Sequence, residues 1–110
     1  MDFEKVCIIK KDNTREKFNV QKVVVAVNKS ANRVLYTFSQ EELDYICRFV
    51  EEQVEQRGLM EIPIAQMHNI VEGALDYVKP EVAKSYRDYR NYKQDFVRML
   101  DDVYKKSQSI

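Results

Sequence analysis

The residues best suited to chemistry in this 110-residue chain gather between positions 8 and 22. Lys10, Lys11 and Lys22 are cations that can hold phosphate groups, and Glu16 can accept hydrogen bonds from a base or a sugar. Strand alternation would place Ile8 on the same face as Lys10. An apolar side chain followed by an ammonium group suits a ligand with a flat base and a phosphate tail. The segment therefore favours nucleotide binding, although lysines beside a hairpin turn also serve simply to keep the turn soluble.

A helix N-terminus is predicted directly after these residues. Apolar side chains recur at helical spacing, at Val20, Val23, Val24, Val27 and Ala31. Asn19 is placed to cap this helix, and its side chain could also contact a base or a ribose. Lys22 lies one turn into the helix, close to the end that favours an anion. The run of valines also suits a strand, so that alternative stays open.

A β-hairpin is predicted over residues 6–18, ahead of this helix. The run from Val6 to Ile9 is rich in residues that favour strands. Asp12-Asn13 supplies the turn, because both residue types tolerate a left-handed backbone.

Capping and turn signals predict three more helices and a third strand. Ser39 and Glu42 form a capping box for the second helix, which ends at Gly58. The short run over residues 59–62 suits a third strand. Each proline suits the first turn of a further helix, at Pro63 and Pro80. The chain is therefore predicted to be one α+β domain, with a small three-stranded sheet packed on a bundle of about four helices.

Composition argues against several functional classes. With only two glycines, the chain cannot build a glycine-rich phosphate loop, so Lys and Arg side chains must hold any phosphate. No hydrolytic, redox or metal motif is recognisable, so an enzyme is not expected. The two cysteines form no CxxC pair and are expected to be reduced thiols of a cytoplasmic protein. No membrane span and no signal peptide are recognised.

Charge is balanced in total but not along the chain. The net charge is zero overall, yet residues 1–33 carry +4, residues 34–78 carry −7 and residues 79–110 carry +3. If the two basic ends meet, they form a positive site that suits one compact anion better than a long nucleic-acid backbone. Alternatively, the ends merely attract the acidic middle and keep the domain compact.

The N-terminal segment resembles the signature of the ATP-cone domain, the nucleotide-sensing module at the N-terminus of many ribonucleotide reductases. That signature reads roughly V-x-K-R-D-G-x-x-E-x-F-[ND]-x-x-K-I, and the residues in its positions are Ile8, Lys10, Lys11, Asp12, Glu16, Phe18, Asn19, Lys22 and Val23. The run from Val82 to Arg90 is similar to the family's closing V-A-x-x-Y-x-x-Y-R. Asn13 stands where the family usually has glycine, and Lys11 stands where arginine is usual. The resemblance covers about residues 5–95.

The resemblance implies allosteric binding of ATP or dATP, with Mg²⁺, rather than catalysis. The phosphate or base contacts that it implies in the first segment are Lys10, Lys11 and Lys22. The base or ribose contacts are Glu16 and Asn19, with Ile8 lining the base. Such a module would regulate ribonucleotide reductase by changing the oligomeric state of the reductase, and would through it influence DNA replication.

From the last helix, the resemblance implies that Arg90 and Lys93 are phosphate ligands, with Arg87 behind them. Together with Lys84 these residues recur every third position, so the row drifts about 60° per step and not all can face one site. His68 on the third helix is implied as a nucleotide contact, and an exposed or capping histidine is the competing interpretation.

The expected domain organisation is an ATP cone over residues 1–104 and a frayed tail, or the start of a linker to a missing catalytic domain, over 105–110. The expected partners are adenine nucleotides, a reductase catalytic domain and further copies in a nucleotide-dependent oligomer. The alternative is a nucleotide-responsive transcriptional or nucleic-acid-binding regulator. Nucleic acid is disfavoured by the acidic residues on the last helix, and a zinc-ribbon repressor by the lack of cysteines before Val6. A structural interaction domain, using the helical stripe from Leu43 to Val54, is a third possibility.

Overall fold

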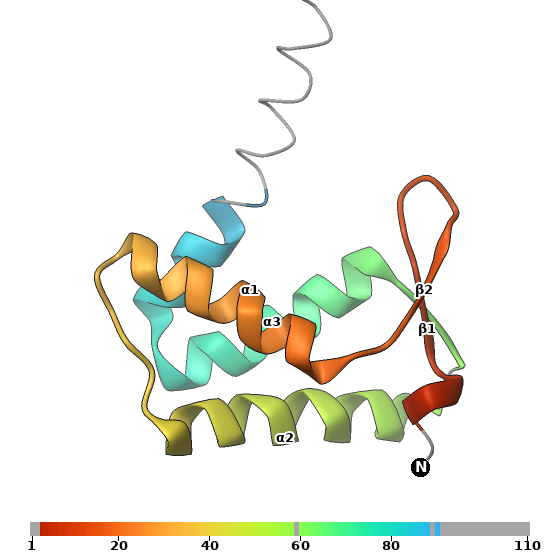
Figure 1. Cartoon of the computed structure of the whole chain (residues 1–110), viewed down its shortest axis with the longest axis horizontal. Helices are drawn as coiled ribbons and strands as arrows, with labels where there is room; N and C mark the ends of the chain where they lie inside the picture. The colour runs from red at the N-terminus through yellow and green to blue at the C-terminus, as the bar shows by residue number, and fades with distance from the viewer. Residues whose placement is uncertain (1–2, 59, 89, 91–110) are drawn as a thin grey trace, which may run out of the picture.

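The structure is a computed structural model that describes residues 3–58, 60–88 and 90. Its elements are a short 3-10 helix (Phe3–Lys5), β1 (Cys7–Ile9), β2 (Arg15–Lys17), α1 (Val20–Arg33), α2 (Gln40–Arg57), β3 (Glu61–Pro63), α3 (Ile64–Val78) and a fourth helix over residues 80–88. The strands lie at one end of the molecule and the helices occupy the rest, with α2 running along one side (Figure 1). The predicted α+β architecture is confirmed.

The three strands form one mixed sheet in the order β2-β1-β3. β1 is antiparallel to β2, with Ile8 opposite Glu16, and parallel to β3, with Ile8 opposite Ile62. The hairpin turn contains Asn13 at a φ of 67°, the left-handed conformation predicted for it. The first strand is therefore the central one.

Capping predictions are confirmed at the first two long helices. The Asn19 side chain accepts a hydrogen bond of 2.9 Å from the Gln21 amide at the start of α1. Ser39 and Glu42 form the reciprocal capping box of α2, and Gly58 ends that helix at a φ of 61°. The valine-rich segment is thus a helix, because that conformation buries its apolar residues on a single face.

The junction between β3 and α3 differs from the prediction in detail. The third strand is Glu61–Pro63 rather than residues 59–62, and Pro63 precedes the helix instead of opening its first turn. Its extended backbone, with ψ at 142°, allows Pro63 to lie opposite Ile9 in the sheet. The predicted continuation of the last helix beyond residue 90, the domain end at 104 and the tail over 105–110 lie outside the described residues.

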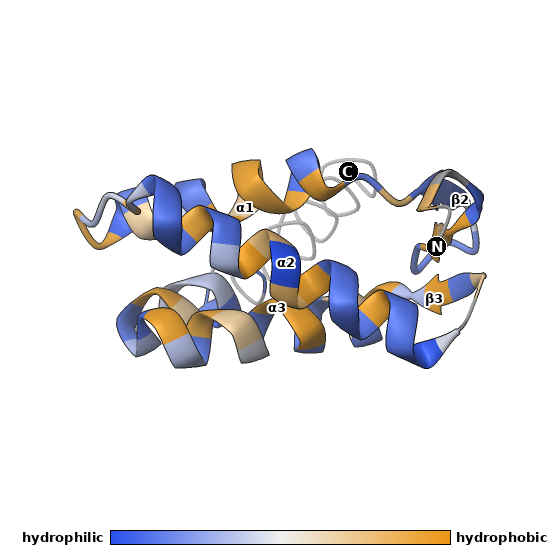
Figure 2. Ribbon diagram, turned by 90° about the horizontal axis from the view of Figure 1, so that it is seen from below, coloured by the Kyte–Doolittle hydropathy of each residue, from blue (hydrophilic) through white to orange (hydrophobic). Residues whose placement is uncertain are grey.

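The core joins the sheet to the helices. Ile46, Ile62 and Leu75 are fully buried, and they come from α2, β3 and α3. Hydrophilic and hydrophobic stretches alternate along α2, as expected of a helix with one buried face (Figure 2). The buried Ser85 hydroxyl donates a 2.8 Å hydrogen bond to the Ser30 carbonyl and so ties the fourth helix to α1. None of the described helices combines the length and the apolar composition needed to cross a bilayer.

The end of α1 holds a leucine in a conformation that favours glycine. Leu35 has a φ of 58°, and the amides of Leu35 and Tyr36 donate to the carbonyls of Asn32 and Ala31 in a Schellman motif. Because its side chain is 96% exposed, Leu35 gains little from burial. Leu35→Gly should therefore raise the free energy of unfolding by about 0.5–1 kcal/mol in denaturant titrations. Leu35→Ala keeps the Cβ atom and should give no such gain; an equal gain would contradict the backbone explanation.

Candidate functional site

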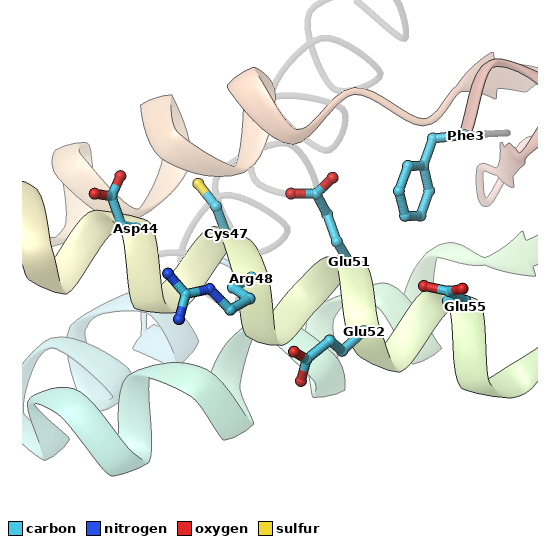
Figure 3. Close-up of a pocket in the computed structure, with 7 residues that line it drawn as sticks. All are labelled: Phe3, Asp44, Cys47, Arg48, Glu51, Glu52 and Glu55. Atoms are coloured by element: carbon cyan, nitrogen blue, oxygen red, sulfur yellow. The ribbon is translucent and has the colours of Figure 1, made fainter. Parts of the chain in front are cut away.

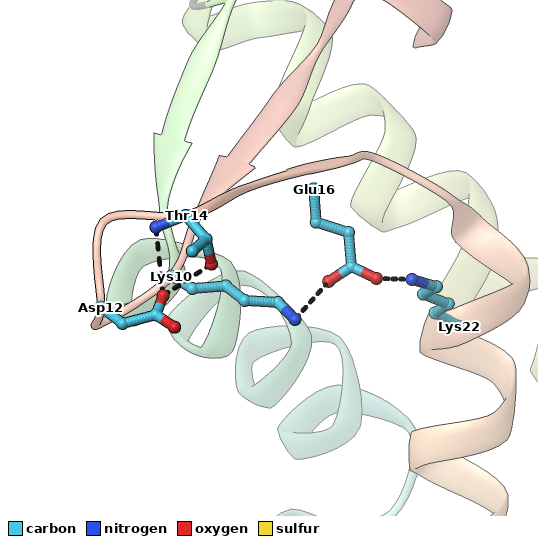
Figure 4. A network of polar contacts seen from close by, with 5 residues as sticks. All are labelled: Lys10, Asp12, Thr14, Glu16 and Lys22. Carbon is cyan, nitrogen blue, oxygen red and sulfur yellow. Dashed lines mark hydrogen bonds and ion pairs between the residues drawn. The ribbon is translucent and has the colours of Figure 1, made fainter.

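Three predicted site residues meet beside the hairpin (Figure 4). Lys10 follows β1, Glu16 lies in β2 and Lys22 lies in the first turn of α1. The Lys10 Nζ atom is 3.3 Å from Glu16 Oε2, and Lys22 Nζ pairs with the other carboxylate oxygen, Oε1. Both lysine side chains remain about half exposed, whereas that of Glu16 is 31% exposed. The sheet and α1 therefore present two ammonium groups around one carboxylate, where a ligand can reach them.

Hydrogen bonds fix the hairpin turn that carries Lys10 and Lys11. The Asp12 carboxylate accepts bonds from the Thr14 hydroxyl at 2.6 Å and from the Thr14 amide at 3.0 Å. These bonds lower the pKa of Asp12. The Lys10 carbonyl also accepts from the Asn13 amide. The two lysines are thus held on a defined loop.

Ile8 and Asn19, two other predicted site residues, also have structural roles. Ile8 is only 7% exposed and belongs to the core, so its predicted contact with a base stays a prediction. Asn19 uses its side-chain oxygen to cap α1, which leaves its amide N–H groups to donate to a ligand.

His68 lies among positive charges from distant parts of the sequence. Its Nδ1 atom is 2.7 Å from the Tyr86 hydroxyl on the fourth helix, with the two rings edge to face. Burial, together with the smaller effect of the positive charges of Arg90 and Lys11, lowers the pKa of His68 to about 4. Burial also raises the pKa of Tyr86 to about 12, so both partners are neutral at pH 7. Residues of the hairpin turn and of the C-terminal helical segment thus both lower the pKa of His68.

Arg87 and Arg90 pair with a carboxylate on α3. Arg90 Nη1 is 3.0 Å from Glu72 Oε1, and Arg87 Nη1 is 3.8 Å from Glu72 Oε2. Glu72 Oε1 is sealed from solvent and its contact with Arg90 is ionic, without the alignment of a hydrogen bond. Lys93, the last predicted phosphate ligand, lies outside the described residues.

Two members of this cluster were not predicted as site residues. Tyr86 is 8% exposed and belongs to the core, and Glu72 lies in α3. A signal was present, because His68 and Glu72 are one helical turn apart, as are Tyr86 and Arg90. Whether these two pairs of residues face each other depends on the angle at which α3 and the fourth helix cross.

The lowered pKa of His68 predicts a loss of stability in mild acid. As pH falls from 6.5 towards about 4, the unfolded chain binds a proton at this position before the folded domain does. The contribution of His68 to the free energy of unfolding is therefore complete above pH 6.5 and is lost across this range. Denaturant titrations at several pH values give the free energy of unfolding as a function of pH. This free energy should fall less steeply with falling pH in His68→Gln than in the wild type. Equal slopes would contradict the prediction.

A pocket along α2 has the opposite electrostatic character (Figure 3). Its lining is mainly acidic and consists of Phe3, Asp44, Cys47, Arg48, Glu51, Glu52 and Glu55. None of the predicted site residues lines it. Burial and the neighbouring Glu51 and Asp44 raise the pKa of Cys47, so this cysteine is a protonated thiol. Such a pocket repels phosphate.

Within residues 3–58, 60–88 and 90, no group of three or more His, Cys, Asp or Glu side chains could hold a metal ion.

A three-stranded mixed sheet joined to four helices, with basic side chains gathered near its hairpin, defines a small α+β domain within the described residues. The family model described as the ATP cone domain matches residues 6–95, and the chain belongs to that family. ATP cones bind ATP or dATP as allosteric ligands and are not themselves catalytic.

Curated relatives of two kinds are similar to this chain. The transcriptional repressor NrdR of Lactobacillus gasseri is 30% identical over 100 residues, covering 87% of this chain and 63% of the repressor. NrdR of Prochlorococcus marinus subsp. pastoris is 28% identical over 104 residues, with coverages of 89% and 62%. The anaerobic ribonucleoside-triphosphate reductase of Haemophilus influenzae is 34% identical over 89 residues, covering 76% of this chain and 12% of the reductase.

The chain thus spans a little under two thirds of the length of the repressors that it matches. The repressors match a larger share of this chain than the reductase does. The expectation that disfavoured a repressor, because no cysteines precede Val6, is therefore not supported.

Proposed function

We propose that this domain binds ATP or dATP and thereby regulates ribonucleotide reduction. Membership of the ATP-cone family supports the class of ligand. The observation that carries the proposal is the convergence of cations from separate elements, with Lys10 and Lys22 on Glu16, and Lys11 and Arg90 acting on His68. These are groups that bind phosphates through charge-assisted hydrogen bonds.

A triphosphate can replace Glu16 as the partner of the two lysines at small cost. Ion pairs at exposed sites contribute only about 0–1 kcal/mol to stability, because water screens them. A triphosphate offers several charged oxygens to the same ammonium groups. Magnesium would be bound mainly through the phosphates, as is usual for this ion. Asn19 would donate to a base or a ribose through its free amide hydrogens.

The first candidate for the regulated partner is a reductase. In this proposal the cone is the N-terminal part of a larger cytoplasmic chain, and the bound nucleotide controls the catalytic domain through the oligomeric state. The match to an anaerobic ribonucleoside-triphosphate reductase supports it.

The second candidate is a transcriptional regulator that responds to nucleotide. The matches to NrdR repressors favour it, since they cover most of this chain. The net charge of zero gives the cone little general attraction for nucleic acid, so DNA contact would come from another part of that protein.

Calorimetric titration of the protein with ATP, dATP and GTP in the presence of Mg²⁺ tests the shared proposal. ATP or dATP is expected to bind and to raise the thermal midpoint progressively with concentration, because ligand binding stabilises the folded state by mass action. GTP should bind more weakly. No binding of ATP or dATP by the folded protein would contradict the proposal.

A further inference from the structure

We propose that Glu72 is a positioning residue of the nucleotide site, which holds the Arg87 and Arg90 guanidinium groups for contact with phosphate. This inference rests on the proposed function. The Glu72 carboxylate lies between the two arginines, 3.0 Å from Arg90 Nη1 and 3.8 Å from Arg87 Nη1. A single acidic side chain on α3 therefore restrains both Arg87 and Arg90.

The chemistry of the pair leaves the arginines able to bind a second anion. A guanidinium has five N–H donors, whereas a carboxylate has about four acceptor positions. Two arginines therefore carry roughly ten donors against about four acceptors on Glu72. The remaining donors can contact phosphate oxygens while the ion pair is kept.

Burial distinguishes Glu72 from the other carboxylate of the site. The side chain of Glu72 is 12% exposed, compared with 31% for Glu16. Glu72 is thus fixed within the packing of α3 against the fourth helix. It lies one helical turn from His68, which contacts Tyr86 on the fourth helix. A long arginine side chain loses much rotamer freedom when it is immobilised, and Glu72 has already imposed part of that loss before a nucleotide arrives.

Two substitutions separate positioning from charge. Glu72→Ala should weaken ATP binding roughly tenfold, because the arginines must then be ordered by the ligand itself. Glu72→Gln keeps the shape and an acceptor oxygen and should bind ATP within about threefold of the wild type. AMP, which lacks the outer phosphates, should bind Glu72→Ala and the wild type alike. In the Arg87→Ala/Arg90→Ala background, Glu72→Ala should cause no further loss.

Calorimetry with ATP and AMP measures these affinities, and circular dichroism with thermal unfolding checks each variant's fold. Unchanged ATP affinity in Glu72→Ala, or equal losses for ATP and AMP, would overturn the positioning role while leaving the proposed function intact. A wild type that binds no ATP would overturn both. If Glu72→Ala does not fold, Glu72→Asp, which withdraws the carboxylate by one methylene group, carries the test with the same expectation.

Discussion

Alanine at Lys10 or Lys22 is expected to weaken ATP or dATP binding roughly ten- to a hundredfold while the unliganded domain keeps its fold. Each substitution removes a charge-assisted contact worth about 1.5–3 kcal/mol. It also leaves Glu16 with one counter-charge fewer, so that the carboxylate repels the phosphates more strongly. Stability should change by less than about 1 kcal/mol, because both pairs lie on a solvent-accessible surface.

The matched control for this pair is Lys29→Ala. Lys29 is an exposed lysine of α1 that lies seven residues beyond Lys22, about 10 Å further along the helix axis. Its removal changes the net charge by the same amount and should leave affinity nearly unchanged. Calorimetric titration measures the three affinities. If Lys10→Ala and Lys22→Ala bind nucleotide as the wild type does, these lysines do not form the site. If they unfold the protein, their role is structural.

Ile62→Ala should lower the free energy of unfolding by about 2–5 kcal/mol, the usual cost of removing a fully buried isoleucine side chain. Ile62 is 0% exposed and links the sheet to the helical core through β3. A domain of this size is stable by only about 5–15 kcal/mol, so the variant should populate the unfolded state detectably on mild heating. ATP should restore part of the stability by mass action.

Ile64→Ala provides the comparison for that prediction. The substitution Ile64→Ala removes the same atoms as Ile62→Ala. Ile64 is half-buried at the start of α3, only two residues further along the chain. Its loss should be clearly smaller. Denaturant titrations of both variants measure the difference, and equal losses would show that burial of Ile62 is not what stabilises the junction.

The local features of the fold could be predicted from the sequence. The caps at Asn19 and Ser39 and the turn at Asn13 depend on hydrogen bonds or backbone angles within a few residues, which residue types report directly. Leu35 shows the limit of this reasoning. Its left-handed backbone could not be predicted, because glycine or asparagine is the usual residue there and leucine carries no such signal.

The site could be predicted as a set of residue types but not as an arrangement. The proximity of Lys10, Glu16 and Lys22 follows from their spacing, because a hairpin and a following helix bring neighbours in sequence together. Their common role in binding stays a prediction. The pairs formed by Glu72 with Arg90 and by His68 with Tyr86 depend on the angle at which α3 meets the fourth helix. That angle is set by tertiary packing, which no local pattern records.

The central position of β1 has a consequence for synthesis on the ribosome. β1 and β2 emerge together and can pair at once, but β3 follows only after α1 and α2. Until β3 emerges, one edge of β1 has no neighbour in the sheet, and such an edge is a template for pairing with other chains. A nascent or truncated chain that stops before Glu61 therefore exposes the strand that leads into Lys10. Covering that edge of β1 therefore waits until α1, α2 and β3 have been synthesised.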